Sequence, residues 1–220
     1  MSTDRFGLAE GEYTPDPAKD LTLLLDGFFE HLARALELPA DRLGAIRRRH
    51  AELEESNAHL IVDEPARYNL KLTLALVAAY QFLRPELGRD KAIAAIQAAF
   101  VEPYAEDMRS GTRAMLDAAP DPFTAMVDMA KSREKYAFGA GFEFRHAADD
   151  DRRFFEDVHR CFYHDVLVAN GAPELTPSMC AFDANWIEAI DPARHGFRFE
   201  RRTTIGMGGT HCPFHFQRNE

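Results

Sequence analysis

Apolar residues along the first two thirds of the chain recur at intervals of three and four. This spacing aligns side chains on one face of an α-helix. In residues 20–37 the aligned set is Leu21, Leu24, Leu25, Phe28, Phe29, Leu32 and Leu36. The same spacing predicts four further helices. The first begins at Pro39, and the other three run over 65–83, 90–117 and 120–138. Pro85 and Gly88 are expected to separate the second of these from the third.

The pattern changes near residue 139, where apolar and polar residues begin to alternate in short stretches. Alternation with a period of two is typical of strands that have one buried face. The acidic run at 148–151 is expected to form the turn between two such strands. Two short helices should follow, one that ends at Gly171 and one that begins near Ser178.

The end of the chain predicts a β-hairpin. Phe197 and Phe199 alternate on the outgoing strand, and a glycine-rich turn follows. Cys212, Phe214 and Phe216 alternate on the return strand, so Cys212 is expected to point inward.

The order of these elements predicts an α+β fold. A helical N-terminal two-thirds should pack with a small antiparallel β-sheet and helices in the C-terminal third. We expect a flexible arm over 1–17, a helical region over 18–138, and an α+β region over 139–220 that carries the site. The last two should form one compact unit, because 220 residues correspond to about one large domain.

Composition and charge narrow the choice of partners. The formal net charge of −10 argues against nucleic acid and anionic membranes, since both require a basic surface. The apolar run at 70–83 is too short to span a bilayer. It fits either burial inside the chain or the subunit interface of a homo-oligomer. A cytoplasmic location is expected, because the N-terminus has no signal-peptide pattern and the three cysteines are an odd number.

Two of the three cysteines lie where the predicted elements could bring them together. On a helix, Cys180 and Asp183 are three residues apart and share a face. A nearby anion raises the pKa of a thiol, so Asp183 fits a proton carrier for a reaction at carbon better than an activator of the thiolate. A position of Cys180 near the helix start would favour its thiolate through the helix dipole. Cys212 would face the same interior from the hairpin.

Two other interpretations of the cysteines remain open. Buried cysteine is a common small hydrophobic residue, so all three could be core residues. Zinc accepts the ligand spacings present here, which are Cys161 with His164, Cys180 with Asp183, and His211 or Cys212 with His215. However, His211 and His215 occupy the strand face opposite Cys212. We therefore expect no metal and no other cofactor.

The C-terminal third resembles a known family in its motifs. A helix and loop, "CFYHDVLVANGAPELTPSMCAFD", ends in a C-x-x-D step, and paired arginines, "TTIGMGG" and "HCPFHF" follow. Over about residues 140–217 these motifs resemble the L-2-amino-thiazoline-4-carboxylic acid hydrolase family. The resemblance implies cytosolic opening of a small cyclic amidine-like substrate, with aminothiazoline carboxylate converted to an N-carbamoyl cysteine. Pro213 departs from the family, in which an acidic residue commonly follows this cysteine.

The resemblance also implies roles for individual residues. Cys180 would attack the electrophilic ring carbon, and Asp183 would carry a proton to the ring nitrogen or the leaving sulfur. Cys180 is preferred to Cys212 as the nucleophile because Asp183 shares its helix face. The other expected site residues line the pocket or bind the small-molecule substrate: Cys212, the amides of Gly208 and Gly209, His215 or Arg202 on a substrate carboxylate, and Cys161 as a third wall.

Two alternative functions compete with this one. A C-x-x-D step with a cysteine about thirty residues later is also similar to the site of alkylmercury lyases, where two thiols hold the metal and the carboxylate protonates the departing carbon. That similarity implies a soft-metal-handling thiol site. A non-enzymatic small-molecule-binding or sensor domain would instead hold Cys180 deeply buried and unreactive. No basic recognition helix accompanies the site, which favours the enzyme.

Overall fold

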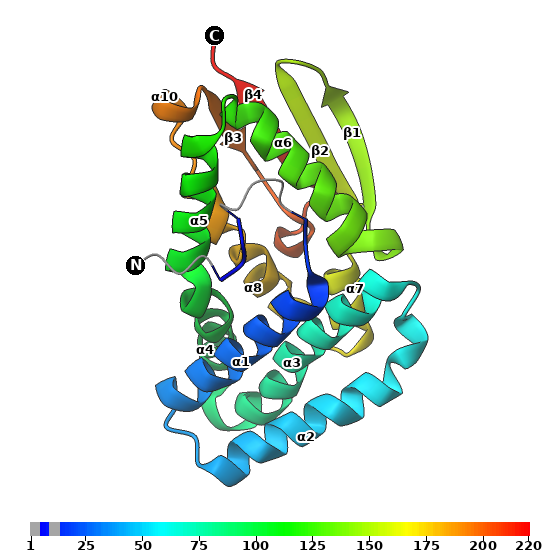
Figure 1. The fold of residues 1–220 in the computed structure, drawn as a ribbon. Coiled ribbons are helices and arrows are strands. Elements are labelled where there is room, and N and C mark those ends of the chain that lie inside the picture. Colours follow the sequence, from blue (N-terminus) through cyan, green and yellow to red (C-terminus); the bar gives the residue numbers. More distant parts are fainter. Residues whose placement is uncertain (1–4, 9–13) are drawn as a thin grey trace.

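The computed structural model describes residues 5–8 and 14–220, and its first half is helical (Figure 1). The helices of this half are α1 (Pro17–Ala35), α2 (Ala40–Ser56), α3 (Glu64–Leu87), α4 (Arg89–Val101), α5 (Ala105–Ala118) and α6 (Pro122–Arg133). A π-helical turn, Glu134–Phe138, follows α6 and leads toward the sheet.

The C-terminal part adds four strands and four short helices. They are β1 (Glu143–Asp149), β2 (Arg153–Arg160), α7 (Phe162–Ala169), α8 (Thr176–Ala181), α9 (Ala184–Ile187), α10 (Pro192–His195), β3 (Phe197–Glu200) and β4 (Cys212–Arg218). All strand pairs are antiparallel, and the order across the sheet is β1-β2-β4-β3. The predicted α+β class is confirmed, as are both hairpins.

Two of the predicted helix boundaries are wrong. α3 continues through Pro85 to Leu87, so Pro85 costs the helix the hydrogen bond that its own N–H would have donated but does not end it, and Gly88 ends the helix at a φ of +79°. The helix expected over 90–117 is two helices, since Pro103 lies in a 3-10 turn between α4 and α5. Proline has no N–H to donate, so it fits the first turn of a new segment better than a helix interior.

The arm expected over 1–17 lies partly outside the described residues, which omit 1–4 and 9–13. Within the described part, Phe6 and Leu8 are buried. The Phe6 ring packs edge-on against Tyr104, with 6.2 Å between ring centroids. This part of the arm therefore packs on the core.

Two apolar cores form the interior of the described chain. One core contains residues from the first four helices, α1, α2, α3 and α4, and from α7 and α8. The apolar run at 70–83 is buried in it. The other joins α5, α6 and Trp186 with the inward face of the sheet. α6 lies along that face (Figure 1), where Phe123 of α6 contacts Phe197 of β3. The candidate site lies between the two cores, because residues of both line it.

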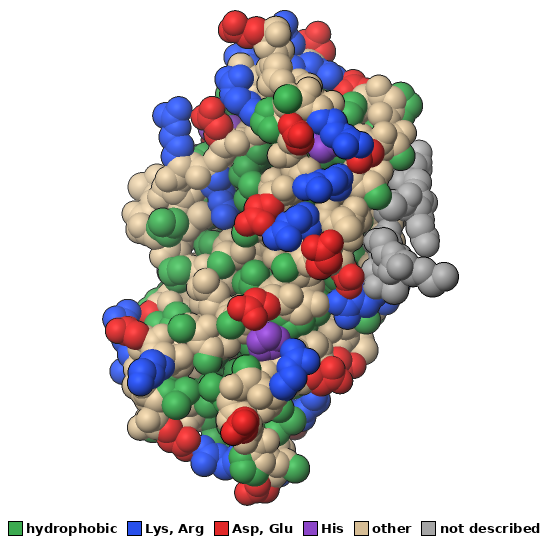
Figure 2. All heavy atoms as spheres, turned by 90° about the vertical axis from the view of Figure 1, so that its left-hand side faces the viewer, with side chains coloured by type: hydrophobic (Ala, Val, Ile, Leu, Met, Phe, Trp, Pro, Cys, Tyr) green, Lys and Arg blue, Asp and Glu red, His purple; other side chains and the backbone are tan. Residues whose placement is uncertain are grey.

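The outer surface carries charges of both signs. Figure 2 shows acidic and basic side chains interspersed over the face in view. None of the helices in the described ranges is long and apolar enough to cross a membrane.

The loop between β3 and β4 packs on α8 through a glycine. Gly206 lies in a 3-10 turn, and a Cβ added to it would be 2.8 Å from Thr176 Cγ2 and 3.0 Å from the Thr176 carbonyl carbon. The absence of a side chain thus lets the turn approach the start of α8. This contact holds the hairpin loop against the helix that carries Cys180.

We predict that Gly206→Ala lowers the free energy of unfolding by about 1–3 kcal/mol, because its methyl group overpacks this contact. Gly44→Ala in α2 is the matched control. There the added Cβ meets only the end of the Arg48 side chain, at 3.5 Å, and a gain of about 0.5–1 kcal/mol is expected for alanine in a helix. Urea unfolding of both variants tests this. Equal midpoints for Gly206→Ala and the original chain would contradict it.

Candidate active site

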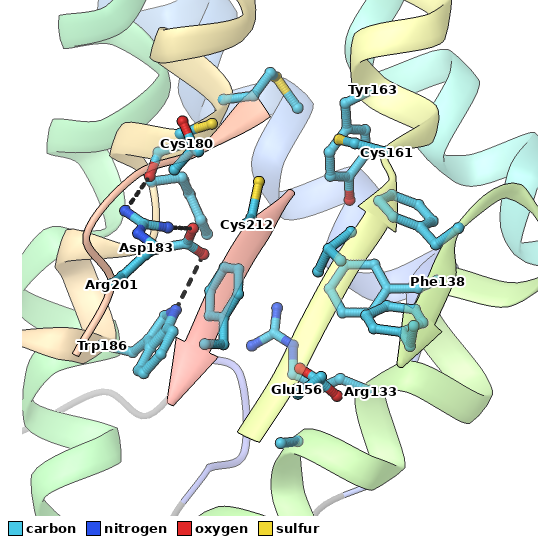
Figure 3. Close-up of a pocket in the computed structure, with 18 of the residues that line it drawn as sticks. Arg133, Phe138, Glu156, Cys161, Tyr163, Cys180, Asp183, Trp186, Arg201 and Cys212 are labelled. Carbon is cyan, nitrogen blue, oxygen red and sulfur yellow. Dashed lines mark hydrogen bonds and ion pairs between the residues drawn. The ribbon is translucent and has the colours of Figure 1, made fainter. Parts of the chain in front are cut away.

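The three cysteines, widely separated in the sequence, line one cavity of about 180 Å³ (Figure 3). Cys180 comes from α8, Cys212 begins β4, and Cys161 precedes α7. Apolar side chains make up most of the remaining wall, among them Leu72, Phe100, Met126, Phe138, Met179 and Phe214. A partly enclosed, mainly apolar space of this kind suits a small molecule with a few polar anchors.

Asp183 is held in place by two donors at one end of the cavity. It lies in the turn between α8 and α9, where its carboxylate forms an ion pair with Arg201 and accepts a hydrogen bond from Trp186 Nε1 at 3.2 Å. Arg201 also donates to the carbonyl oxygen of Cys180 at 3.1 Å. Figure 3 shows this group beside the Cys180 and Cys212 side chains. The carboxylate therefore has a fixed orientation.

Burial raises the pKa of all three thiols. It raises the pKa of Cys161 to about 12 and that of Cys212 to about 11, and it also raises the pKa of Cys180. Cys180 and Cys212 each add to the raised pKa of Cys161, and Cys180 adds to that of Cys212, as expected for thiols that line one cavity. The resting thiols are accordingly protonated at neutral pH.

Several donors oppose this effect at the two thiols near Asp183. The Ile205 N–H donates to Cys212 Sγ at 3.1 Å, and the Arg201 charge favours the thiolate at both Cys180 and Cys212. The Thr204 hydroxyl favours it at Cys180, although it is buried without a partner of normal hydrogen-bond geometry among the described residues. Negative charge that develops on either sulfur would meet donors already in position.

The expected position of Cys180 near a helix start is wrong. α8 begins at Thr176 rather than near Ser178, and Cys180 lies in its last turn. A preceding 3-10 turn, Pro173–Leu175, moves the start of the helix toward the N-terminus. The helix dipole therefore gives no assistance to this thiolate. Cys180 and Asp183 nevertheless both face the cavity, because the backbone stays helical through the turn that joins them.

Four of the expected substrate-binding residues lie outside the cavity wall. The Arg202 side chain is 87% exposed and pairs with Glu200. His215 lies on the outer face of the sheet, where its Nε2 is 2.9 Å from Asp157. Gly208 and Gly209 belong to the exposed end of the hairpin turn, and Gly208 supplies its positive φ of +86°. We do not carry these four forward as substrate contacts.

The histidines considered as zinc ligands also lie apart from the thiols. His164 Nδ1 is 2.9 Å from the Thr176 hydroxyl. The His211 ring stacks on His159 over the outer sheet face, as the strand alternation predicted. None of these histidines lines the cavity. Cys161 does line it, as expected, next to Tyr163.

Three charged residues of the cavity were missed in the sequence. They are Arg201, Arg133 from the end of α6, and Glu156 from β2. A signal for Glu156 was available in the sequence. Phe154, Glu156 and Val158 are two residues apart in a strand and so share its inward face, which places a carboxyl group among apolar side chains. Burial, with the nearby Glu134, raises the pKa of Glu156 to about 8.

The raised thiol pKa values predict an unusual alkylation profile. From about pH 6 to about pH 10, iodoacetamide labelling of Cys180 and Cys212 should be slower than that of a solvent-exposed thiol and should still be rising at about pH 9. Peptide-resolved mass spectrometry measures each rate. A plateau for either cysteine below about pH 8 would show an activated thiolate and contradict this prediction.

Comparison with known proteins identifies a family for the chain. The family model for L-2-amino-thiazoline-4-carboxylic acid hydrolase matches residues 68–216, well over half of the chain. The match confirms the resemblance and extends it from the C-terminal motifs into α3 and the helices that follow. No curated relative and no solved structure matches the chain. The chain belongs to the L-2-amino-thiazoline-4-carboxylic acid hydrolase family.

Proposed function

We propose that the protein hydrolyses a small cyclic amidine of the thiazoline type, such as 2-amino-thiazoline-4-carboxylate, through a covalent intermediate on Cys180. One observation carries the proposal. Cys180 and Cys212 line the same cavity as Asp183, which Arg201 and Trp186 hold in place. The family name supports a hydrolase and a thiazoline substrate. The side chains that line the cavity support the roles assigned to individual residues.

The first step forms a bond between Cys180 Sγ and the ring carbon that lies between nitrogen and sulfur. Asp183 accepts the thiol proton and passes it to the ring sulfur, which leaves as a thiol when its bond to carbon breaks. Water then adds to the same carbon, and Cys180 departs with a proton. The net reaction consumes one water and yields an open-chain N-carbamoyl product with a free thiol.

The protonated state of the thiols makes a base necessary. Because burial raises the pKa of Cys180, the proton must leave as the carbon–sulfur bond forms. Asp183 is the carboxylate nearest to Cys180 in the sequence, three residues away, and it lies on the same cavity wall. The positive charge of Arg201 acts on Cys180 and Cys212 alike, so it stabilises negative charge in the transition state.

A substrate carboxylate needs a cationic partner in a cavity that is mainly apolar. Arg201 lies at the thiol end of the cavity, in the ion pair with Asp183. Arg133 lines the cavity at the other end, near Glu156 (Figure 3). Because the ring must reach the thiols, the carboxylate on its far side would reach Arg133, and we assign the carboxylate anchor to that residue.

Substitution of these residues should separate chemistry from binding. Against 2-amino-thiazoline-4-carboxylate, Cys180→Ser should lower kcat by ~10³-fold, and Asp183→Asn by ~10²-fold or more. Arg133→Gln should raise KM by about tenfold with a smaller effect on kcat. Steady-state assays that follow release of the product thiol measure all three.

Two variants serve as controls. Arg202→Gln removes an exposed arginine outside the cavity and should leave KM unchanged, and Cys161→Ser should retain kcat within about threefold. Full activity of Cys180→Ser would contradict the assigned nucleophile. If the unmodified protein opened no thiazoline but bound Hg²⁺ through Cys180 and Cys212 together, an alkylmercury-lyase-like function would replace the hydrolase.

A further inference from the structure

Three potential metal ligands meet on the inward side of the β1–β2 hairpin. Glu134, His146 and Glu156 each place one ligand atom within 4.8 Å of the other two. His146 Nε2 is 3.0 Å from Glu134 Oε2 and 4.0 Å from Glu156 Oε1. His146 and Glu156 are direct cross-strand partners, and Glu134 opens the π-helical turn after α6. Three separate elements thus converge on one point.

Glu156 provides an independent reason to expect a ligand there. The residue is only 7% exposed, and its Oε1 has no hydrogen-bond partner in the part of the chain that the structure describes. A buried carboxyl oxygen without a partner is costly, and such groups are rare. This is the same oxygen that lies 4.0 Å from His146 Nε2. A cation between the two would supply the missing partner.

The distances and charges fit a divalent ion. Bonds of about 2.0–2.2 Å at tetrahedral or octahedral angles hold ligand atoms ~3–3.5 Å apart, so the observed 3.0 and 4.0 Å require side-chain shifts below about 1 Å. Once a cation displaces the proton of Glu156, two carboxylates balance a charge of +2. One imidazole with two carboxylates suits Zn²⁺ or Mn²⁺ better than Mg²⁺, which prefers oxygen ligands alone.

Nearby cations limit the affinity. Lys131 is neutralised in part by Asp149, with Nζ 2.8 Å from a carboxylate oxygen. The positive charge of Arg133 acts on Glu156, so it opposes a bound cation. We expect a Kd in the range of about 1–100 μM rather than the far tighter binding of a structural zinc site.

The location gives the ion a route in and a contact with the cavity. Glu134 and His146 line a depression on the surface, together with Glu143 and Lys135. Glu156 lines the thiol cavity on the other side. We propose that Glu134, His146 and Glu156 bind one Zn²⁺ or Mn²⁺ ion in the wall between the surface depression and the thiol cavity. This site is independent of the proposed hydrolysis.

Titration of the full-length protein with MnCl₂ tests the site, because Mn²⁺ binds thiols poorly and the three cysteines then do not interfere. Calorimetry, with the electron paramagnetic resonance of free Mn²⁺ as a second readout, should show one ion per chain. Glu134→Gln and Glu156→Gln should each weaken binding at least tenfold. Glu143→Gln is the matched control, since Glu143 lines the same depression but pairs with Arg145.

A thermal shift gives a further check that does not depend on enzymatic activity. Mn²⁺ and ZnCl₂ should raise the Tm of the original chain and of Glu143→Gln, but not that of Glu134→Gln. Glu134 is partly exposed, so this variant is expected to fold even if Glu156→Gln does not. Absence of saturable Mn²⁺ binding, or binding that Glu134→Gln and Glu156→Gln both retain, would overturn the proposal. Zinc binding lost in Cys180→Ser but kept in Glu134→Gln would also overturn it, because the ion would then belong to the thiols.

Discussion

The ion pair between Asp183 and Arg201 is the contact on which the candidate site depends. Asp183 lies between α8 and α9, and Arg201 lies on the segment that joins β3 to β4, so the pair ties these helices to the hairpin segment at one end of the cavity. Both side chains are largely buried, at 27% and 15% exposed. Loss of one partner from such a pair leaves an uncompensated charge and is strongly destabilising. The same guanidinium also holds the Cys180 carbonyl, and thus fixes the end of α8.

This constraint gives the cavity two chemically different ends. At one end the thiols of Cys180 and Cys212 are held protonated by burial, beside a carboxylate and donors that can receive charge. At the other end lie Arg133 and Glu156, with apolar and aromatic side chains between. A ring with an electrophilic carbon at one side and a carboxylate at the other matches that polarity. The proposed cation site would close the second end without contacting the thiols.

Regular periodicity was enough to predict part of the site. Strand alternation correctly turned Cys212 inward and His215 outward, and the three-residue spacing put Cys180 and Asp183 on one wall. The same patterns predicted the α+β class and the antiparallel hairpins. In each case a side chain's direction follows from a repeating backbone geometry, which the sequence shows directly.

The errors arose where the backbone is irregular. Residues 201–204 have no regular secondary structure, so no period could show that Arg201, and not its neighbour Arg202, enters the cavity. The position of Cys180 at the end of α8 depended on a 3-10 turn that no repeat announces. Glu156 was a different failure, because its place on an apolar strand face was readable, but its partners, Glu134 and His146, come together only in three dimensions.

Trapping of the covalent intermediate tests the assigned chemistry most directly. Protein mixed with 2-amino-thiazoline-4-carboxylate and quenched in acid within the first turnover would be measured as intact mass and then as peptides. Because the first step adds the whole substrate and releases nothing, we expect an adduct equal to the substrate mass, located on Cys180 and absent from Cys180→Ser. Turnover without any adduct, at a rate that Cys180→Ser retains, would show that water attacks the ring directly and that the thiols have another role.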